Sequence, residues 1–112
     1  MKNENDYQAT LIIKIKQRLP ECMVLKNDAK YIQGIPDLMV LNGDRWAALE
    51  CKKSKYAPSR PNQPYYISKM NEMSFAAKIY PENEEEVLDA LQRSLRAGRP
   101  ARVSRRKQIS LD

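Results

Sequence analysis

The sequence contains no histidine, and this absence removes several kinds of catalytic and metal site. A serine or cysteine nucleophile has no imidazole base to activate it, and zinc has no histidine ligand. The two cysteines, Cys22 and Cys51, are too few to complete a four-ligand structural zinc site. Any catalysis by this chain therefore depends on carboxylates, lysine, tyrosine or a hard metal ion.

Long apolar runs and a disulfide framework are also missing. No apolar run approaches the roughly 18 residues that are needed to cross a bilayer, and two cysteines are few for a secreted fold. The first residues, MKNENDYQ, are polar and are not typical of a secretory signal. We therefore expect a reduced, cytoplasmic protein without a membrane partner, located in the host cytoplasm if the gene belongs to a phage.

The positive charge is concentrated at the C-terminal end. Between Arg93 and Asp112 there are six arginines and one lysine against one acid, whereas the first 92 residues hold 13 basic and 13 acidic side chains. The net charge of +6 therefore comes from the last twenty residues. This pattern favours a polyanionic partner, most commonly nucleic acid. A basic tail that only increases solubility is the alternative.

The apolar pattern predicts a small α/β (α+β) domain. Apolar residues recur at helical spacing between Asp6 and Leu19, and Pro20 ends this predicted helix. Further helices are expected at 65–73 and 82–95, and strands at 22–25, 38–41, 46–52 and 74–80. This order predicts a central mixed sheet flanked by helices within residues 1–98. Residues 99–112 form a basic tail that could add a weak edge strand.

The segment GIPDLMVLNGDRWAALECKKS, residues 34–54, carries the most informative pattern. Asn42-Gly43 favours the positive φ angles of a tight hairpin turn. Folding the chain back at this turn brings Asp37 close to Glu50. Because alternate side chains of a strand share a face, Glu50 and Lys52 point the same way.

This arrangement suits a divalent metal ion. Neighbouring carboxylates repel each other, and Mg²⁺ or Mn²⁺ relieves the repulsion while keeping several water ligands. The Lys52 ammonium group could then orient the attacking water or stabilise the transition state. The alternative is a surface ion pair without function, worth under about 1 kcal/mol.

Pro36-Asp37 and Glu50-Cys51-Lys52 resemble the two motif elements of the PD-(D/E)xK nuclease superfamily. The Gly-Ile-Pro-Asp lead-in, preceded by a helix and a strand, is most similar to VRR-NUC domain nucleases, and small phage and bacterial Holliday-junction resolvases are next. The resemblance covers residues 4–97. It implies a restriction-endonuclease-like fold, Mg²⁺- or Mn²⁺-dependent cleavage of DNA, and a homodimer.

The resemblance also implies roles for individual residues. It assigns the metal ligands and the catalytic ammonium group to Asp37, Glu50, the backbone carbonyl of Cys51, and Lys52. Glu4 is the candidate for a further metal ligand from the first helix, and a simple helix-end charge is the alternative. Gln63 stands where many members have a glutamine that faces the site, although Pro64 directly after it departs from the pattern.

Several basic residues are candidates for contacts with DNA phosphates. They are Lys26, Lys53, Arg93, Arg96, Arg99, Arg102, Arg105 and Arg106. The arginines from 93 to 102 recur every three residues, so on a continuing helix they would lie across roughly one face. Such a stripe follows a backbone without reading bases. For the two lysines, a solvated surface charge is the alternative.

These observations predict a metal-dependent DNA endonuclease without an organic cofactor, selective for branched, flapped or junction DNA. One alternative is a non-catalytic nucleic-acid-binding protein on the same fold. Another is a small basic packaging protein whose hairpin charges are incidental. Cleavage of DNA, lost on substitution of Asp37 or Lys52, distinguishes the enzyme from both alternatives.

Overall fold

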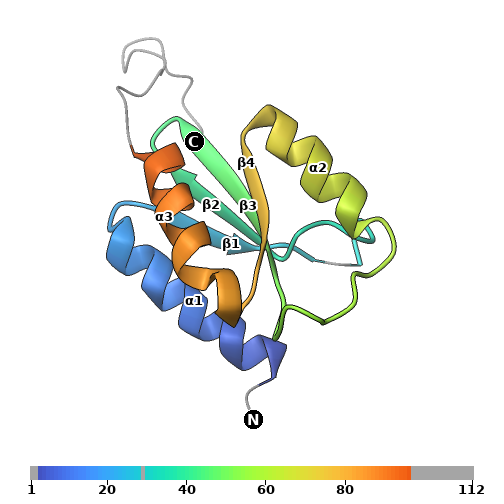
Figure 1. Cartoon of the computed structure of the whole chain (residues 1–112). Helices are drawn as coiled ribbons and strands as arrows, with labels where there is room; N and C mark the ends of the chain where they lie inside the picture. Colours follow the sequence, from blue (N-terminus) through green and yellow to red (C-terminus); the bar gives the residue numbers. More distant parts are fainter. Residues whose placement is uncertain (1–2, 29, 97–112) are drawn as a thin grey trace, which may run out of the picture.

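A computed structural model describes residues 3–28 and 30–96 (Figure 1). The predicted order of helix, strand, hairpin, helix, strand and helix is confirmed. The elements are α1 (Glu4–Arg18), β1 (Met23–Lys26), β2 (Leu38–Asn42), β3 (Arg45–Cys51), α2 (Gln63–Met73), β4 (Phe75–Ile79), the 3-10 turn η1 (Pro81–Asn83) and α3 (Glu84–Leu95).

The four strands form a mixed sheet in the order β1-β2-β3-β4. The first three strands are antiparallel neighbours, and β4 runs parallel to β3. Parallel neighbours require a crossover connection, which α2 provides between β3 and β4. The predicted α+β class with a central mixed sheet is therefore confirmed.

Helices cover both faces of the sheet, with α1 and α3 on one side and α2 on the other (Figure 1). The core lies on the side of α1 and α3, because the apolar face of each helix packs against alternate residues of β2 and β3. Fully buried members of this core are Leu11, Ile15, Leu38, Val40, Leu49, Leu88, Leu91 and Leu95. Glu50 lies on the opposite face of β3 from Leu49, which is the face that α2 covers.

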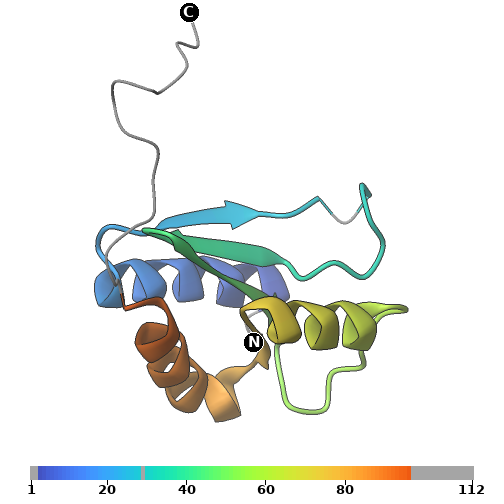
Figure 2. The same cartoon turned by 90° about the horizontal axis from the view of Figure 1, so that it is seen from above.

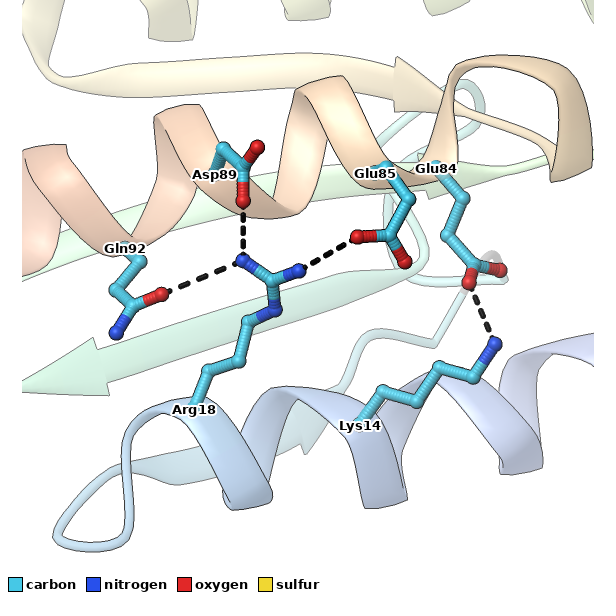
Figure 3. Close-up of polar contacts among 6 residues, drawn as sticks. All are labelled: Lys14, Arg18, Glu84, Glu85, Asp89 and Gln92. Atoms are coloured by element: carbon cyan, nitrogen blue, oxygen red, sulfur yellow. Dashed lines mark hydrogen bonds and ion pairs between the residues drawn. The ribbon is translucent and has the colours of Figure 1, made fainter.

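Ion pairs join α1 to α3 along their shared edge (Figure 3). Lys14 Nζ lies 2.5 Å from Glu84 Oε2. Arg18 reaches two acids of α3, with 2.5 Å to Asp89 Oδ1 and 2.9 Å to Glu85 Oε2. We call this set of pairs the α1–α3 seam. Each acid in the seam has a basic partner on α1, so the pairs link the two helices.

The hairpin turn is displaced by one residue from its predicted centre. Asn42 pairs with Arg45, so Gly43 and Asp44 are the two central residues. Gly43 has a φ of 64° at the first central position, where a type II′ turn needs positive φ. The Asn42 side chain instead donates a hydrogen bond to Leu95 O at 2.7 Å and ties the turn to the end of α3.

The bounds of two helices differ from the prediction. α2 begins at Gln63, before the predicted Tyr65, because Pro64 lies in the first turn, where a missing N–H costs nothing. α3 begins at Glu84, after the predicted Glu82, because the 3-10 turn η1 occupies Pro81–Asn83. It ends at Leu95 as predicted, and Arg96 has a ψ of 118° that does not continue the helix. The arginines from 93 to 102 would share one face only on a continuing helix, and α3 does not continue through Arg96. Arg99, Arg102, Arg105 and Arg106, and the suggested edge strand, lie outside the described residues.

Within residues 3–28 and 30–96, no helix is both long enough and apolar enough to cross a membrane. Both cysteines are buried with free thiols. Cys51 belongs to the core, where burial raises the pKa of its thiol. Its side chain therefore contributes packing, as the alternation along β3 predicts.

Candidate functional site

The pairing of β2 with β3 brings Asp37 to the position next to Glu50. Leu38 is opposite Leu49 in the antiparallel pair of strands. The residue before Leu38, Asp37, therefore lies beside the residue after Leu49, Glu50. Asp37 Oδ2 accepts a hydrogen bond from the backbone N–H of Cys51 at 2.9 Å. Its backbone oxygen accepts another from the N–H of Asn27 at 2.8 Å. Asp37 is therefore fixed between the end of β1 and the end of β3.

Glu50 lies in a buried polar cluster with Lys52 and Gln63. Lys52 Nζ is 3.4 Å from Glu50 Oε2, and both side chains are only 3% exposed. Gln63 is also buried, and its amide nitrogen donates to the same oxygen. The Gln63 amide oxygen accepts from the backbone N–H of Arg60 at 2.6 Å. This second bond sets the amide orientation, so that its NH₂ group faces Glu50.

The other carboxylate oxygen, Glu50 Oε1, is buried and has no hydrogen-bond partner in the part of the chain that the structure describes. Burial and the charge of Asp37 raise the pKa of Glu50 to about 7. Burial also raises the pKa of Asp37, although the Cys51 N–H and Lys52 act in the opposite direction. Lys52 therefore supplies too little positive charge to offset the desolvation of both carboxyl groups, and their pKa values stay raised.

These donors fit a hydrated divalent ion better than a closed metal cage. Among residues 3–28 and 30–96, no group of three or more His, Cys, Asp or Glu side chains is placed to hold a metal ion. The donors that the structure brings together are the two carboxylates, including the partnerless Glu50 Oε1, and the resemblance adds the backbone carbonyl of Cys51. Mg²⁺ is commonly held by one or two carboxylates and keeps several waters, so this set is sufficient.

Glu4 begins α1 and lies close to the site. Asn3 caps the helix by accepting a hydrogen bond from the N–H of Asp6 at 2.8 Å. Glu4 lines a surface hollow together with Lys52, and its charge contributes to the raised pKa of Asp37. Glu4 therefore adds negative charge to the region without completing a three-carboxylate group.

Two hollows open beside the buried cluster, and Arg60 lines both. The first is also lined by Glu4, Lys52, Lys53 and Pro58. The second is also lined by Lys30, Gln33, Gly34, Asp37 and Gln63. The exposed Arg60 and Lys30 therefore bring positive charge to the openings of the site. Sequence reasoning missed both residues, because they lie in loops without a periodic pattern.

Gly34 holds the loop before β2 against the turn before α2. Its φ is 91°, which residues with a Cβ rarely adopt. A Cβ at this position would lie 2.5 Å from Pro61 O and 2.7 Å from the Cβ of Asn62. This close approach explains how Gln63, the residue after Asn62, reaches Glu50. The sequence signal was the glycine directly before Ile-Pro-Asp.

The predicted phosphate-contacting residues occupy different parts of the molecule. Lys53 is exposed beside the first hollow. Lys26 is exposed at the end of β1 but pairs with Leu38, so it belongs to the sheet face opposite Glu50. Arg93 and Arg96 are exposed near the end of α3, which Asn42 binds at the hairpin turn. These two arginines therefore lie at the other end of the sheet from Asp37.

Comparison with protein-family models, curated proteins and solved structures finds no match for this chain. The structure itself joins Asp37, Glu50, Lys52 and Gln63 in one cluster, with Glu4, Lys53 and Arg60 at its opening.

Proposed function

We propose that this protein is a metal-dependent DNA endonuclease of the PD-(D/E)xK type, most similar to VRR-NUC domain nucleases. The observation that carries the proposal is the partnerless, buried Glu50 Oε1 beside Asp37, with the Lys52 ammonium group 3.4 Å from the other Glu50 oxygen. A structural ion pair would satisfy both oxygens of the acid. Here one oxygen remains available for a cation.

Asp37, Glu50 and the carbonyl of Cys51 would hold Mg²⁺ or Mn²⁺. When bound, the ion lowers the pKa of a water and screens the charge that develops on the phosphate. Lys52 is nearly fully buried, so its ammonium group acts where few waters screen it. It orients the attacking water and stabilises negative charge on the phosphate oxygens.

Gln63 is a positioning residue in this scheme. Its amide is held by the Arg60 N–H on one side and contacts Glu50 Oε2 on the other. This contact fixes the rotation of the Glu50 carboxylate and leaves Oε1 free to bind metal. Gln63→Glu would add a further acid to the cluster and is expected to slow cleavage by misplacing the metal, while Gln63→Asn would lose the contact through its shorter reach.

The proposed function includes a restriction-endonuclease-like fold and a homodimer. The mixed sheet with helices on both faces is compatible with a reduced restriction-endonuclease-like fold. A second copy of the chain is the proposed partner of the β1 edge, because Met23 and Leu25 are 60% and 43% exposed on this edge strand. Sedimentation of wild-type protein and Leu25→Lys tests this, with a dimer expected only for wild type.

Cleavage of a panel of labelled DNAs tests the enzymatic proposal most simply. Linear, nicked, flapped and four-way DNAs are incubated with and without Mn²⁺, using wild-type protein, Asp37→Asn and the surface control Lys16→Ala. We expect Mn²⁺-dependent cutting of at least one branched or flapped DNA by wild type and Lys16→Ala. Binding of these DNAs without any cutting would contradict the enzyme and favour a non-catalytic nucleic-acid-binding protein.

A further inference from the structure

Two loops at the site end of the molecule expose tyrosine rings beside basic residues. Tyr31 is 82% exposed in the loop between β1 and β2, and Tyr56 is 85% exposed in the loop between β3 and α2. The β1–β2 loop and the last part of the β3–α2 loop both lie on the side of the molecule where α2 starts (Figure 2). An aromatic ring usually buries most of its surface, so two rings left in solvent here require an explanation.

The backbone beneath Tyr31 is held in a turn. The N–H of Tyr31 donates to Asp28 O at 3.0 Å, and the N–H of Lys30 donates to Asp28 Oδ1 at 2.8 Å. Further along, the N–H of Ile35 donates to Ile32 O at 3.3 Å. These hydrogen bonds tie Lys30 and Tyr31 to Asp28, while the Tyr31 ring remains in solvent.

The backbone around Tyr56 is held in a similar way. Ala57 is buried, its N–H donates to Ser54 O at 3.2 Å, and its oxygen accepts from Lys78 Nζ at 3.3 Å. The N–H of Lys55 donates to Glu82 Oε1 at 3.3 Å. Both neighbours of Tyr56 are therefore anchored while its ring remains outside.

Positive charge accompanies each ring. Lys30 precedes Tyr31 and lines the second hollow, and Lys55 Nζ lies 5.8 Å from the centre of the Tyr56 ring. Arg60 belongs to the same loop as Tyr56 and lines both hollows, the second of them together with Lys30 of the other loop. Exposed aromatic rings with cations nearby bind single-stranded nucleic acid, because bases stack on the rings while phosphates contact the cations.

We propose that these two loops hold an unpaired DNA strand at the site, with bases stacked on Tyr31 and Tyr56 and the connecting phosphates near Arg60. Bases inside a duplex stack on each other and leave no face for the rings. The substrate therefore has a single-stranded segment, as in a flap, an overhang or an open junction. The inference deepens the proposed nuclease function and rests on it for cleavage, although strand binding can be measured separately.

Binding to a labelled single-stranded oligonucleotide tests the inference in the full chain carrying Asp37→Asn, so that no cutting interferes. Adding Tyr31→Ala or Tyr56→Ala is expected to weaken binding about tenfold each, within the range for loss of a base-stacking contact. The Phe variants keep the ring and are expected to bind within about twofold of the parent. Ile13→Ala is the matched control, because Ile13 is 60% exposed and belongs to α1, not to either loop.

The outcomes separate this inference from the proposed function. If both Ala variants bind the strand as well as the parent, or if the parent binds blunt duplex as tightly as single strand, the stacking inference is wrong. Continued Mn²⁺-dependent cutting by wild type would then leave the nuclease intact. Conversely, tyrosine-dependent strand binding by a wild-type protein that cuts no DNA would uphold the inference and overturn the nuclease.

Discussion

The α1–α3 seam and the site at the end of β3 both bring charged side chains together, and the two arrangements differ in balance and in exposure. In the α1–α3 seam, Arg18 contacts two acids whose side chains are 78% and 54% exposed (Figure 3). At the end of β3, Glu50 and Lys52 are each 3% exposed, and Asp37 adds a second acid. The acids that Arg18 contacts are solvated, whereas the site is desolvated and has two acids beside one buried lysine.

This difference indicates what each arrangement does. Solvated pairs gain little free energy and cost little to form, so the Arg18 pairs need no explanation beyond linking two helices. Buried charges lose much of their hydration free energy, and the attraction within a cluster of two acids and one base recovers little of it. Such a cluster lowers the stability of the metal-free protein, and a bound cation would correct the imbalance.

The largest expected effect is the difference in cleavage rate between substitution of a lysine in the site and substitution of a lysine in the seam. Lys52→Ala removes the buried ammonium group and is expected to slow cleavage by about 10²–10³-fold, as for loss of a group that stabilises transition-state charge. Lys14→Ala removes a seam partner of Glu84 and is expected to leave the cleavage rate within about twofold. Gel assays at equal protein concentration, with circular dichroism to verify folding, make the comparison. Similar losses of cleavage rate in both variants would contradict a catalytic role for the buried site that the seam does not have.

The next largest effect is expected in the free energy of unfolding, on substitution of Gly34 in the loop that precedes Asp37. Gly34→Ala places a Cβ 2.5 Å from Pro61 O at a φ of 91°. We expect a loss of roughly 2 kcal/mol or more in the free energy of unfolding. Gly43→Asn is the control, because Gly43 also has positive φ but lies in the exposed hairpin turn, and asparagine tolerates this conformation. Urea denaturation showing equal losses would contradict the close approach at Gly34.

Much of the fold could be predicted from the sequence, because helical and alternating apolar patterns reflect burial directly. The positions of Asp37 and Glu50 followed from a short hairpin, where few residues separate the turn from both acids. Gln63 could be named only by resemblance, since its contact with Glu50 depends on how α2 starts at Pro64. Arg60 and Tyr31 escaped prediction, because the approach of two loops depends on tertiary packing around Gly34.

A smaller effect appears in the pH dependence of stability. The pKa of Glu50 in the folded protein is about 7, above its ordinary value of 4.5. The folded state therefore binds this proton more tightly than the unfolded state, so Glu50 makes stability fall as pH rises between these values. Asp37→Asn removes one cause of the shift and is expected to raise the free energy of unfolding of metal-free protein by about 1 kcal/mol at about pH 8.

The same substitution should have little effect at about pH 5, where Glu50 of the folded protein is mostly protonated. Urea denaturation in EDTA at both pH values measures the difference. If Asp37→Asn destabilises the protein equally at both, Asp37 does not oppose the ionisation of Glu50.

The smallest effect is expected in the seam. Arg18→Ala removes two partly exposed ion pairs and is expected to lower the free energy of unfolding by about 0.5–1 kcal/mol. The loss should shrink in high salt, because screening weakens exposed pairs. Thermal denaturation at low and high salt tests this, and a large, salt-independent loss would show that the seam behaves like a buried cluster.

Titration calorimetry with Mn²⁺ tests the central claim most directly. Wild-type protein, Asp37→Asn and the seam variant Arg18→Ala are compared near neutral pH, in buffers of different ionisation enthalpy. We expect wild type and Arg18→Ala to bind Mn²⁺ with release of protons, since Glu50 must ionise to ligate, and we expect Asp37→Asn to lose binding at least tenfold, by about 1.4 kcal/mol or more. Equal binding by all three proteins, or no binding by wild type, would contradict a metal site at Asp37 and Glu50.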